Sequence, residues 1–567
     1  MFHGLNLRIG GVLAGLAAVI LGGCGDSSAG ETAVASAGST GIGETSTGDA
    51  VDSSGTAGDE PPDFACFVER PFPYPPGSPY AGVHSGPLNN DLVPCELPDD
   101  WTLAWHALQG RGIAQPNTYS PDGETTYVTT SAPSEGDCTV FALAVSDGSE
   151  QWCDVLADAR SSTIEVDLDG NLYTTGRGLV VSWSPDGQRR WERAVPSSSL
   201  VEEGEEASAT GVHFTPEGHV ATVTDAGLVL IIDRADGAVL AQLDLPAAYG
   251  FVAASSLGID LVASLPQVVQ DDFLALFGPD SGGGLAKFAG ASGNFSDNTI
   301  AIAPDGTIYV VGGGPDEQHG ALMKVEVQIG IEDGVVELNP GWWTELSASS
   351  ASSPSLSADG RWLKVSDGNS TAGFIDPTSV DANSRVIDTV ACDANTDANE
   401  APFMCAEAYA LPLLSGPALG ATPIYEDGQS WHFEVQLAAL FDTTTPDLVR
   451  YQGAGAPDLE VLLPGDRQWS SVLTLTTDSV VGTTTVMTPS KEEVLGVVLP
   501  STADSEVAVV DRQTGELVFS APITDDSTST VTVGPDLSLY VTQLALLHSL
   551  SVDTRPVGGL MRFAPAK

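Results

Sequence analysis

The stretch DGNLYTTGRGLVVSWSPDGQRRW, residues 169–191, contains the pattern that decides the fold. Two turn signals in it, Asp169-Gly170 and Asp186-Gly187, alternate with short apolar runs that contain Tyr173 and end near Trp191. An Asp-Gly pair between alternating hydrophobic residues is a strong hairpin signal, because a type I′ turn needs positive φ at both central residues. The stretch therefore predicts two consecutive β-hairpins.

Both kinds of turn recur along the chain. Turns of the first kind, like Asp169-Gly170, come just before a strand with an aromatic or aliphatic residue. Their acidic residues stand at positions 122, 169, 217 and 305, which gives spacings of 47, 48 and 88 residues, the last being twice 44. Two hairpins in a period of about 45 residues make four strands per unit, which is typical of a β-propeller blade. Helical signals are nearly absent, and this argues against a parallel α/β fold.

We predict a single all-β propeller of about eight four-stranded blades, with seven or nine as alternatives. Nine candidate units can be marked, and the weakest is Ile259–Phe288, where neither turn has a clean glycine. The last unit ends after its third strand and lacks a fourth. The apolar run Trp101–Ala107 has a tryptophan at the position where the outer strands of other units have a tryptophan. We therefore expect Trp101–Ala107 to supply the outer strand of the final blade, which would remove two exposed sheet edges.

The repeats resemble a known family. Asp169–Trp191 and VAVVDRQTGELVF (Val507–Phe519) look like the PQQ-type repeats of quinoprotein-like propellers, and the likeness runs from about residue 99 to the end. Catalytic members of that family need a pocket with a stacking tryptophan, Ca²⁺ ligands and an aspartate base, and none of these maps onto a position of this chain. We expect Trp152 and Trp191 to pack between blades.

The N-terminus resembles that of a bacterial lipoprotein. A basic residue, Arg8, precedes an uncharged apolar stretch that ends in Leu21-Gly22-Gly23-Cys24, which is similar to a lipobox. The span is short and rich in glycine, which favours a cleaved signal (residues 1–23) over a membrane-spanning helix. The resemblance implies lipidation of Cys24 and a place in the bacterial cell envelope as an outer-membrane lipoprotein, facing the periplasm or exposed at the surface.

Three further segments follow the signal. Residues 24–61 are an acidic Gly/Ser/Thr linker that cannot bury enough apolar surface to order itself. Residues 62–98 are a Pro-rich segment that a disulfide would pin, and residues 99–567 are the propeller. Six cysteines remain besides Cys24, and six allow fifteen pairings. Short loops favour pairs of neighbours, which are Cys66–Cys95, Cys138–Cys153 and Cys392–Cys405.

The charge of the chain restricts its partners. Its 567 residues carry 76 Asp and Glu against 21 Lys and Arg, a formal net charge of −55. Such a chain will not bind nucleic acid through phosphates, nor an anionic membrane through its own charge. The lipid on Cys24 is therefore the expected membrane contact.

One candidate metal site stands out. Oxygen ligands recur at every second position inside the Cys392–Cys405 loop, as at the start of an EF-hand. Ala398 replaces the glycine of that motif and Met404 its last glutamate, so a solvated acidic insertion is the alternative. The candidate Ca²⁺ ligands are Asp393, Asn395, Asp397, Asn399 and Glu400. His213 and His219 lie on either side of a predicted turn. We expect them to be unrelated histidines on a surface hairpin, and a metal-binding pair is the alternative.

No motif for a nucleophile, a phosphate loop or a zinc protease occurs in the sequence. The first reading is therefore a lipid-anchored propeller that binds or scaffolds a protein or glycan partner without catalysis. A PQQ- and Ca²⁺-dependent dehydrogenase, or another propeller enzyme with a site at the channel mouth, is the alternative. The longest segments between repeats, where a site would lie, are Gly312–Gly320, Val380–Pro417 and Ala454–Gln468.

Overall fold

The computed structural model describes residues 64–566 with internal gaps, the longest of which are 254–265, 278–293, 347–352, 368–382, 395–401 and 437–447. The described part is built from eight antiparallel sheets arranged in a ring, which we number as blades 1 to 8 in chain order. The all-β propeller with eight blades predicted from the repeats is confirmed.

Blades 1 to 4 each have four strands that follow one another in the sequence from the inside of the ring outward. Their strands are β2 (Thr118–Tyr119), β3 (Thr125–Thr129), β4 (Val140–Ala144) and β5 (Glu150–Asp154); β6 (Glu165–Val166), β7 (Leu172–Gly176), β8 (Leu179–Trp183) and β9 (Arg189–Ala194); β10 (His213–Phe214), β11 (Val220–Val223), β12 (Leu228–Ile232) and β13 (Val239–Asp244); β14 (Ala301–Ile302), β15 (Ile308–Gly313), β16 (Gly320–Ile329) and β17 (Val336–Leu346).

Blades 5 to 8 complete the ring, and blades 6 and 7 carry a fifth strand each, β23 and β28. The strands are β18 (Ser355–Leu356), β19 (Trp362–Asp367), β20 (Asn383–Asp388) and β21 (Ala408–Pro412); β22 (Ala418–Leu419), β23 (Pro423–Glu426), β24 (Gln429–Gln436), β25 (Leu448–Gln452) and β26 (Pro457–Val461); β27 (Gln468–Trp469), β28 (Thr474–Leu475), β29 (Ser479–Val494), β30 (Val497–Asp511) and β31 (Leu517–Ile523); β32 (Thr532–Val533), β33 (Leu539–Gln543), β34 (Gly559–Pro565) and β1 (Trp101–Ala107).

The ring is closed by the two ends of the propeller chain. β1 pairs antiparallel with β34, from Trp101 opposite Pro565 to Ala107 opposite Leu560. Blade 8 therefore has the order β1-β34-β33-β32, as the tryptophan-bearing run predicted. The N-terminal strand therefore completes the last sheet and covers the edge that β34 would otherwise leave unpaired.

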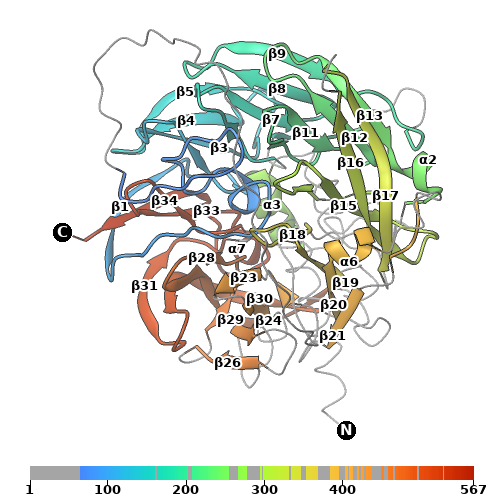
Figure 1. The fold of residues 1–567 in the computed structure, drawn as a ribbon. Coiled ribbons are helices and arrows are strands. Elements are labelled where there is room, and N and C mark those ends of the chain that lie inside the picture. Colours follow the sequence, from blue (N-terminus) through green and yellow to red (C-terminus); the bar gives the residue numbers. More distant parts are fainter. Residues whose placement is uncertain are drawn as a thin grey trace.

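Among the described residues, one short helix precedes the propeller and the others lie in the connections between strands. They are η2 (Val83–Ser85), α2 (Leu245–Tyr249), α3 (Gln267–Phe277), α6 (Thr389–Ala394) and α7 (Leu546–Ser549). The weakest predicted unit, Ile259–Phe288, is not a blade in its described part, because residues 267–277 form α3 in the connection between blades 3 and 4. Figure 1 shows the ring viewed along its axis. Outer strands such as β5, β9, β13 and β17 lie at the rim, and α3 and α7 lie near the middle.

Because neighbouring strands of a blade run antiparallel, successive connections alternate between the two ends of the ring, and each end has its own set of connections. The tight turns between the first and second strands, and between the third and fourth, lie at one end, which we call the turn end. The chain passes from blade to blade at the opposite end, which we call the crossover end. The described Asp-Gly turns of the repeats, such as Asp122-Gly123 and Asp147-Gly148, belong to the turn end.

The predicted turn type is wrong in detail. Gly123, Gly148, Gly170 and Gly187 have φ between 72° and 82°, whereas the aspartates before them are not among the described residues with positive φ. Asp122 and Asp147 instead accept a backbone N–H two residues later, from Glu124 at 3.0 Å and from Ser149 at 3.0 Å. The hairpins therefore need one left-handed residue each, and the aspartate side chain fixes the turn by a local hydrogen bond.

Tryptophans of the outer strands hold successive blades together. Each indole packs on a turn glycine of the next blade, where a Cβ would lie 2.6 to 2.8 Å from the ring, and each Nε1 donates to a carbonyl of the same turn at 2.9 to 3.1 Å. The prediction that Trp152 and Trp191 pack between blades is confirmed. The pairs are Trp105 with Gly148, Trp152 with Gly187, and Trp191 with Gly237.

Candidate functional site

The central channel of the ring is filled at the turn end by the segment that precedes the propeller. The segment arrives over the turns of blade 8, where the Cys66 N–H donates to Pro535 O at 3.3 Å. Residues 80–93, which we call the plug, then reach the innermost strands, and Figure 1 shows this blue N-terminal part of the chain crossing the middle of the ring. Tyr80 and Val93, at its two ends, are fully buried.

Backbone hydrogen bonds tie the plug to three blades. Ile302 N–H of blade 4 donates to Pro87 O at 2.6 Å, and Leu356 N–H of blade 5 donates to Leu88 O at 2.8 Å. Leu475 of blade 7 donates to Asp91 O at 2.9 Å and accepts from Val93 N–H at 2.8 Å. Because these donors belong to different innermost strands, the plug lies on the axis of the ring.

The side chain of Asn89 joins three blades at once. Its Nδ2 donates to Ile300 O at 2.9 Å and to Pro354 O at 3.0 Å, immediately before β14 and β18. Its Oδ1 lies 3.1 Å from Nε2 of His213 on β10. Asn89 is 3% exposed, so these contacts form without competition from water.

A second set of side chains links the plug to blade 8. The Tyr80 hydroxyl donates to Asp91 Oδ1 at 2.6 Å and also contacts the hydroxyl of Thr530, just before β32. The other oxygen of Asp91, Oδ2, lies 2.7 Å from Nδ1 of His84. Blade 8 is thereby joined to the hydrogen-bond network that Asn89 shares with blades 3, 4 and 5.

Buried charges surround the plug on blades 2 and 3. Glu165 of β6 and His213 of β10 are fully buried, with Oε1 and Nδ1 3.2 Å apart. Burial raises the pKa of Glu165, although His213, Tyr74 and Arg70 act in the opposite direction. Burial also lowers the pKa of Arg70 to about 10. These groups form an internal polar network in which each charge depends on its neighbours.

Glycine is required where the plug passes Glu165. Gly82 has φ −177°, which any residue adopts, so the backbone itself does not demand glycine there. A Cβ at Gly82 would, however, lie 2.0 Å from Oε1 of Glu165. The close approach of the plug backbone to this carboxylate therefore explains the glycine.

The plug contains an unusual concentration of strained backbone. His84, Ser85, Asn89 and Asp91 have φ of 50°, 62°, 51° and 46°. The left-handed region costs a non-glycine residue roughly 1–2 kcal/mol, and such strain persists only where surrounding contacts enforce it. The hydrogen bonds of Asn89 and Asp91 supply that enforcement.

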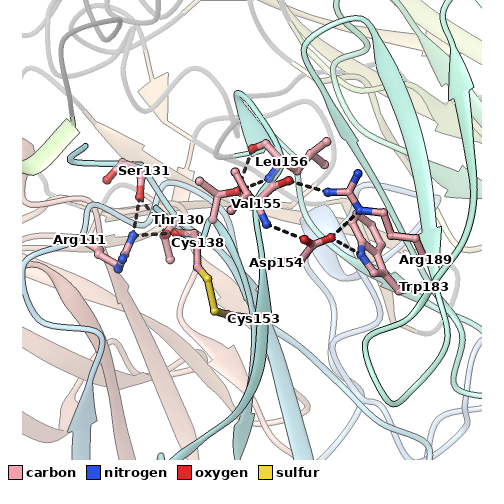
Figure 2. Close-up of a disulfide and its surroundings, with 11 residues drawn as sticks. Arg111, Thr130, Ser131, Cys138, Cys153, Asp154, Val155, Leu156, Trp183 and Arg189 are labelled. Atoms are coloured by element: carbon pink, nitrogen blue, oxygen red, sulfur yellow. Dashed lines mark hydrogen bonds and ion pairs between the residues drawn. A yellow bond between two sulfur atoms is a disulfide. The ribbon is translucent and has the colours of Figure 1, made fainter. Parts of the chain in front are cut away.

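All three expected disulfides are formed. They join Cys66 to Cys95, Cys138 to Cys153 and Cys392 to Cys405. The first brackets the plug, and both of its cysteines belong to the segment before the propeller. The second ties the lead-in of β4 to β5, and Arg111 donates to Cys138 O at 2.7 Å (Figure 2).

Asp154 lies next to that second disulfide (Figure 2) and connects blades 1 and 2. It accepts from Trp183 Nε1 at 2.8 Å and from Arg189 Nε at 2.6 Å. Although its partial burial acts in the opposite direction, these hydrogen bonds lower the pKa of Asp154. The environment of Cys138–Cys153 is therefore a junction between two blades.

Only the first of the candidate calcium ligands is described. Asp393 Oδ1 accepts from Lys324 Nζ at 2.6 Å and from Trp342 Nε1 at 2.9 Å, which joins α6 to blade 4. Asn395, Asp397, Asn399 and Glu400 lie outside the described residues. Within the described part of the chain, no group of three or more His, Cys, Asp or Glu side chains is placed to hold a metal ion.

The histidine expectation needs a correction. His213 is fully buried at the channel, between Glu165 and Asn89, and does not lie on a surface hairpin. His219 is half-buried, after the turn that follows β10. Sequence alone gave no signal for this difference, because the partner that buries His213 is the plug.

The three long segments do not form one surface in their described parts. The turn within Gly312–Gly320 joins the second and third strands of blade 4 and lies at the crossover end. Residues 389–394 and 402–405, within Val380–Pro417, follow the third strand of blade 5 and precede the fourth, so they lie at the turn end. Residues 462, 463 and 467, within Ala454–Gln468, belong to the connection between blades 6 and 7 and lie at the crossover end again, so the described parts of the three segments are divided between the two ends of the ring.

The chain has no match among protein-family models, and no curated protein matches it. Solved structures are similar to it. Quinohemoprotein alcohol dehydrogenase ADHIIG from Pseudomonas putida HK5 is 11% identical over 86% of this chain and 81% of its own, with a TM-score of 0.48. A europium-containing methanol dehydrogenase is 12% identical over 88% and 99%, with a TM-score of 0.46.

BamB from Moraxella catarrhalis is also similar, with 13% identity over 73% of this chain and 96% of its own and a TM-score of 0.34. Identities this low concern the fold alone, because one fold hosts many functions. The eight sheets and their closure by β1 and β34 define the protein as an all-β propeller.

Proposed function

We propose that the protein is a lipid-anchored extracytoplasmic propeller that acts as a binding or scaffolding module. Cys24 carries the lipid, the acidic linker of residues 24–61 separates the anchor from the head, and the head faces the periplasm or the outside of an outer membrane. The partner is a protein or a glycan that binds the surface of the head. Residues 1–63 lie outside the described part of the chain, and no helix within that part is long and apolar enough to cross a membrane.

One observation carries the binding role. The chain itself fills the turn end of its channel with the plug, through hydrogen bonds to the innermost strands of blades 3, 4, 5, 7 and 8. A ring that is closed by β1 and plugged by its own segment is a rigid body with wide end faces. Rigid elements of this kind present loops to a macromolecular partner with little loss of conformational entropy.

The dehydrogenase alternative requires PQQ and Ca²⁺, and the described residues do not fit them. A calcium site needs several oxygen ligands around one point, and no such group of acidic side chains is present among the described residues. The indoles of the buried Trp183 and Trp342 donate to Asp154 and Asp393 and pack within and between blades. We therefore derive no reaction step through this cofactor.

The test is crosslinking of the full-length protein in intact cells of its source, followed by purification and identification of attached molecules. Wild type is compared with Cys24→Ala, which removes the lipidation site and leaves the head unchanged. A partner captured by the wild type and reduced in the Cys24→Ala sample supports an anchored binding module. Dye reduction by the purified protein with PQQ, Ca²⁺ and an alcohol or sugar would replace this proposal with the enzymatic one.

A further inference from the structure

The plug covers a buried pair of titratable side chains, Glu165 of β6 and His213 of β10. Oε1 of Glu165 and Nδ1 of His213 lie 3.2 Å apart, and both side chains are fully buried. The plug backbone at Gly82 passes directly over the Glu165 carboxylate, and Asn89 of the plug contacts the other nitrogen of the His213 ring. Withdrawal of the plug would therefore expose both side chains to water.

The hydrogen bonds of Asn89 fix which nitrogen of His213 carries a hydrogen. One end of the Asn89 amide lies 2.9 and 3.0 Å from two carbonyl oxygens, those of Ile300 and Pro354, so that end is the NH2 group. The opposite end is then an oxygen, which can only accept, and it lies 3.1 Å from Nε2 of His213. Nε2 therefore carries a hydrogen, and Nδ1 is the nitrogen that faces Glu165.

A further proton lies between His213 and Glu165. If Nδ1 and the carboxyl group were both deprotonated, two lone pairs would face each other at 3.2 Å in a buried place. Nδ1 has no other hydrogen-bond partner among the described residues. The pair therefore holds one titratable proton, either as imidazolium with carboxylate or as imidazole with carboxylic acid, and its net charge is zero in both forms.

The other titratable groups that face Glu165 come from the segment that leads to the plug. They are the Tyr74 hydroxyl and the Arg70 guanidinium. The Tyr74 hydroxyl accepts the backbone N–H of Phe214 at 3.1 Å, and Arg70 donates to two backbone carbonyl oxygens. Burial raises the pKa of Tyr74 and lowers that of Arg70 only to about 10. Neither group therefore changes its charge between pH 5.5 and pH 8.5, and the pair is what titrates there.

We propose that the Glu165–His213 pair is a proton-dependent latch, which holds the plug in place at mildly acidic pH and releases it as the pH rises. With the plug in place the pair keeps its proton, because the zero net charge of the buried pair depends on it. With the plug withdrawn both side chains are solvated, and His213 loses its proton above its ordinary pKa of about 6.5. Because the closed state then binds one proton more than the open state, a rise in pH favours opening. The latch sets the pH at which the turn end is closed, independently of which partner the head binds.

The test is hydrogen exchange of the full-length protein between pH 5.5 and pH 8.5, measured by mass spectrometry. The exchange rate of each peptide from residues 80–93 is compared with its intrinsic rate at the same pH, which gives the opening equilibrium of the plug. One proton lost on opening shifts that equilibrium by about tenfold per pH unit. We expect the protection of the plug to be constant up to about pH 6.5 and then to fall by up to about tenfold per unit, whereas the strands β7 and β11 of the same blades keep theirs. Plug protection that does not depend on pH would overturn the proposal.

Glu165→Gln should reverse the response to pH. The amide NH2 of glutamine can donate to Nδ1 of a neutral His213, so the plug of this variant stays in place without a titratable proton. Its withdrawn state still gains a proton on His213 below about pH 6.5. We therefore expect plug protection that is constant at alkaline pH and falls toward pH 5.5. His219→Gln, on the other side of the turn between β10 and β11, is the matched control and keeps the wild-type profile.

Two results in Glu165→Gln would contradict the latch. A role of Glu165 that is only structural would change plug protection by the same factor at every pH. A fall above pH 6.5 that persists in this variant would assign the response to another group of the plug, such as His84, which lies 2.7 Å from Asp91. Both readouts are independent of the outcome of partner capture.

Discussion

Replacing Asn89 by alanine removes the side chain that ties the plug to three blades. The substitution leaves Ile300 O, Pro354 O and His213 Nε2 without their buried partner. At about 1 kcal/mol for each group, the lost hydrogen bonds amount to about 3 kcal/mol. Alanine at a φ of 51° adds about 1 kcal/mol of backbone strain. We expect the free energy of unfolding to fall by about 4 kcal/mol.

The assay is equilibrium unfolding in guanidinium chloride, followed by tryptophan fluorescence, for wild type, Asn89→Ala and Asn89→Gly. Glycine removes the same hydrogen bonds but accepts the left-handed backbone, so Asn89→Gly should be about 1 kcal/mol more stable than Asn89→Ala. The difference between the two variants isolates the backbone strain from the lost contacts. If the free energy of unfolding of Asn89→Ala lies within about 0.5 kcal/mol of the wild-type value, as for a surface substitution, the packed plug is refuted.

Three further predictions concern other parts of the ring. Gly82→Ala forces a methyl group against the Glu165 carboxylate, so we expect a loss of about 1–3 kcal/mol or more in the same assay, which the double variant with Glu165→Asp should partly recover. Trp105→Ala at the ring closure should lower stability by about 3–5 kcal/mol, whereas truncation of the half-exposed Leu103 on the same strand should change it by less than about 0.5 kcal/mol; similar values for both would argue against closure by β1. The pKa of His548 is raised in the folded state, so its contribution to stability is complete below the unfolded pKa of about 6.5 and is lost as the pH rises through the folded value. The loss of stability in His548→Gln should therefore be largest near pH 5.5 and shrink toward pH 9. A loss that grows with pH would contradict a raised pKa of His548.

The architecture was predictable because its signals are local. Turn glycines and the tryptophans of the outer strands recur at a regular spacing, and each tryptophan meets the glycine of the next blade's turn. The same regularity predicts Trp101–Ala107 as the outer strand of the final blade, and its pairing with β34 confirms this. The turn type was wrong, because side chains such as Asp122 and Asp147 stabilise the turns through their own hydrogen bonds.

The plug was not predictable because the contacts that tie it to the blades are distant in sequence. Asn89 meets carbonyl groups more than 200 residues away, and Tyr80 meets Thr530. Nothing in the residues 62–98 alternates or repeats, so neither a strand nor a helix pattern indicates how deeply they are buried. The burial of His213 was missed for the same reason.

Hydrogen exchange of residues 80–93, measured by mass spectrometry on the intact full-length protein, tests the plug most directly. Amides such as Asn89, Asp91 and Val93 donate to buried acceptors in the structure. We predict that peptides covering these residues exchange as slowly as the strands β14, β15 and β33 that line and follow the channel. Exchange that is complete within seconds, while those strands stay protected, would show an open channel and contradict the account.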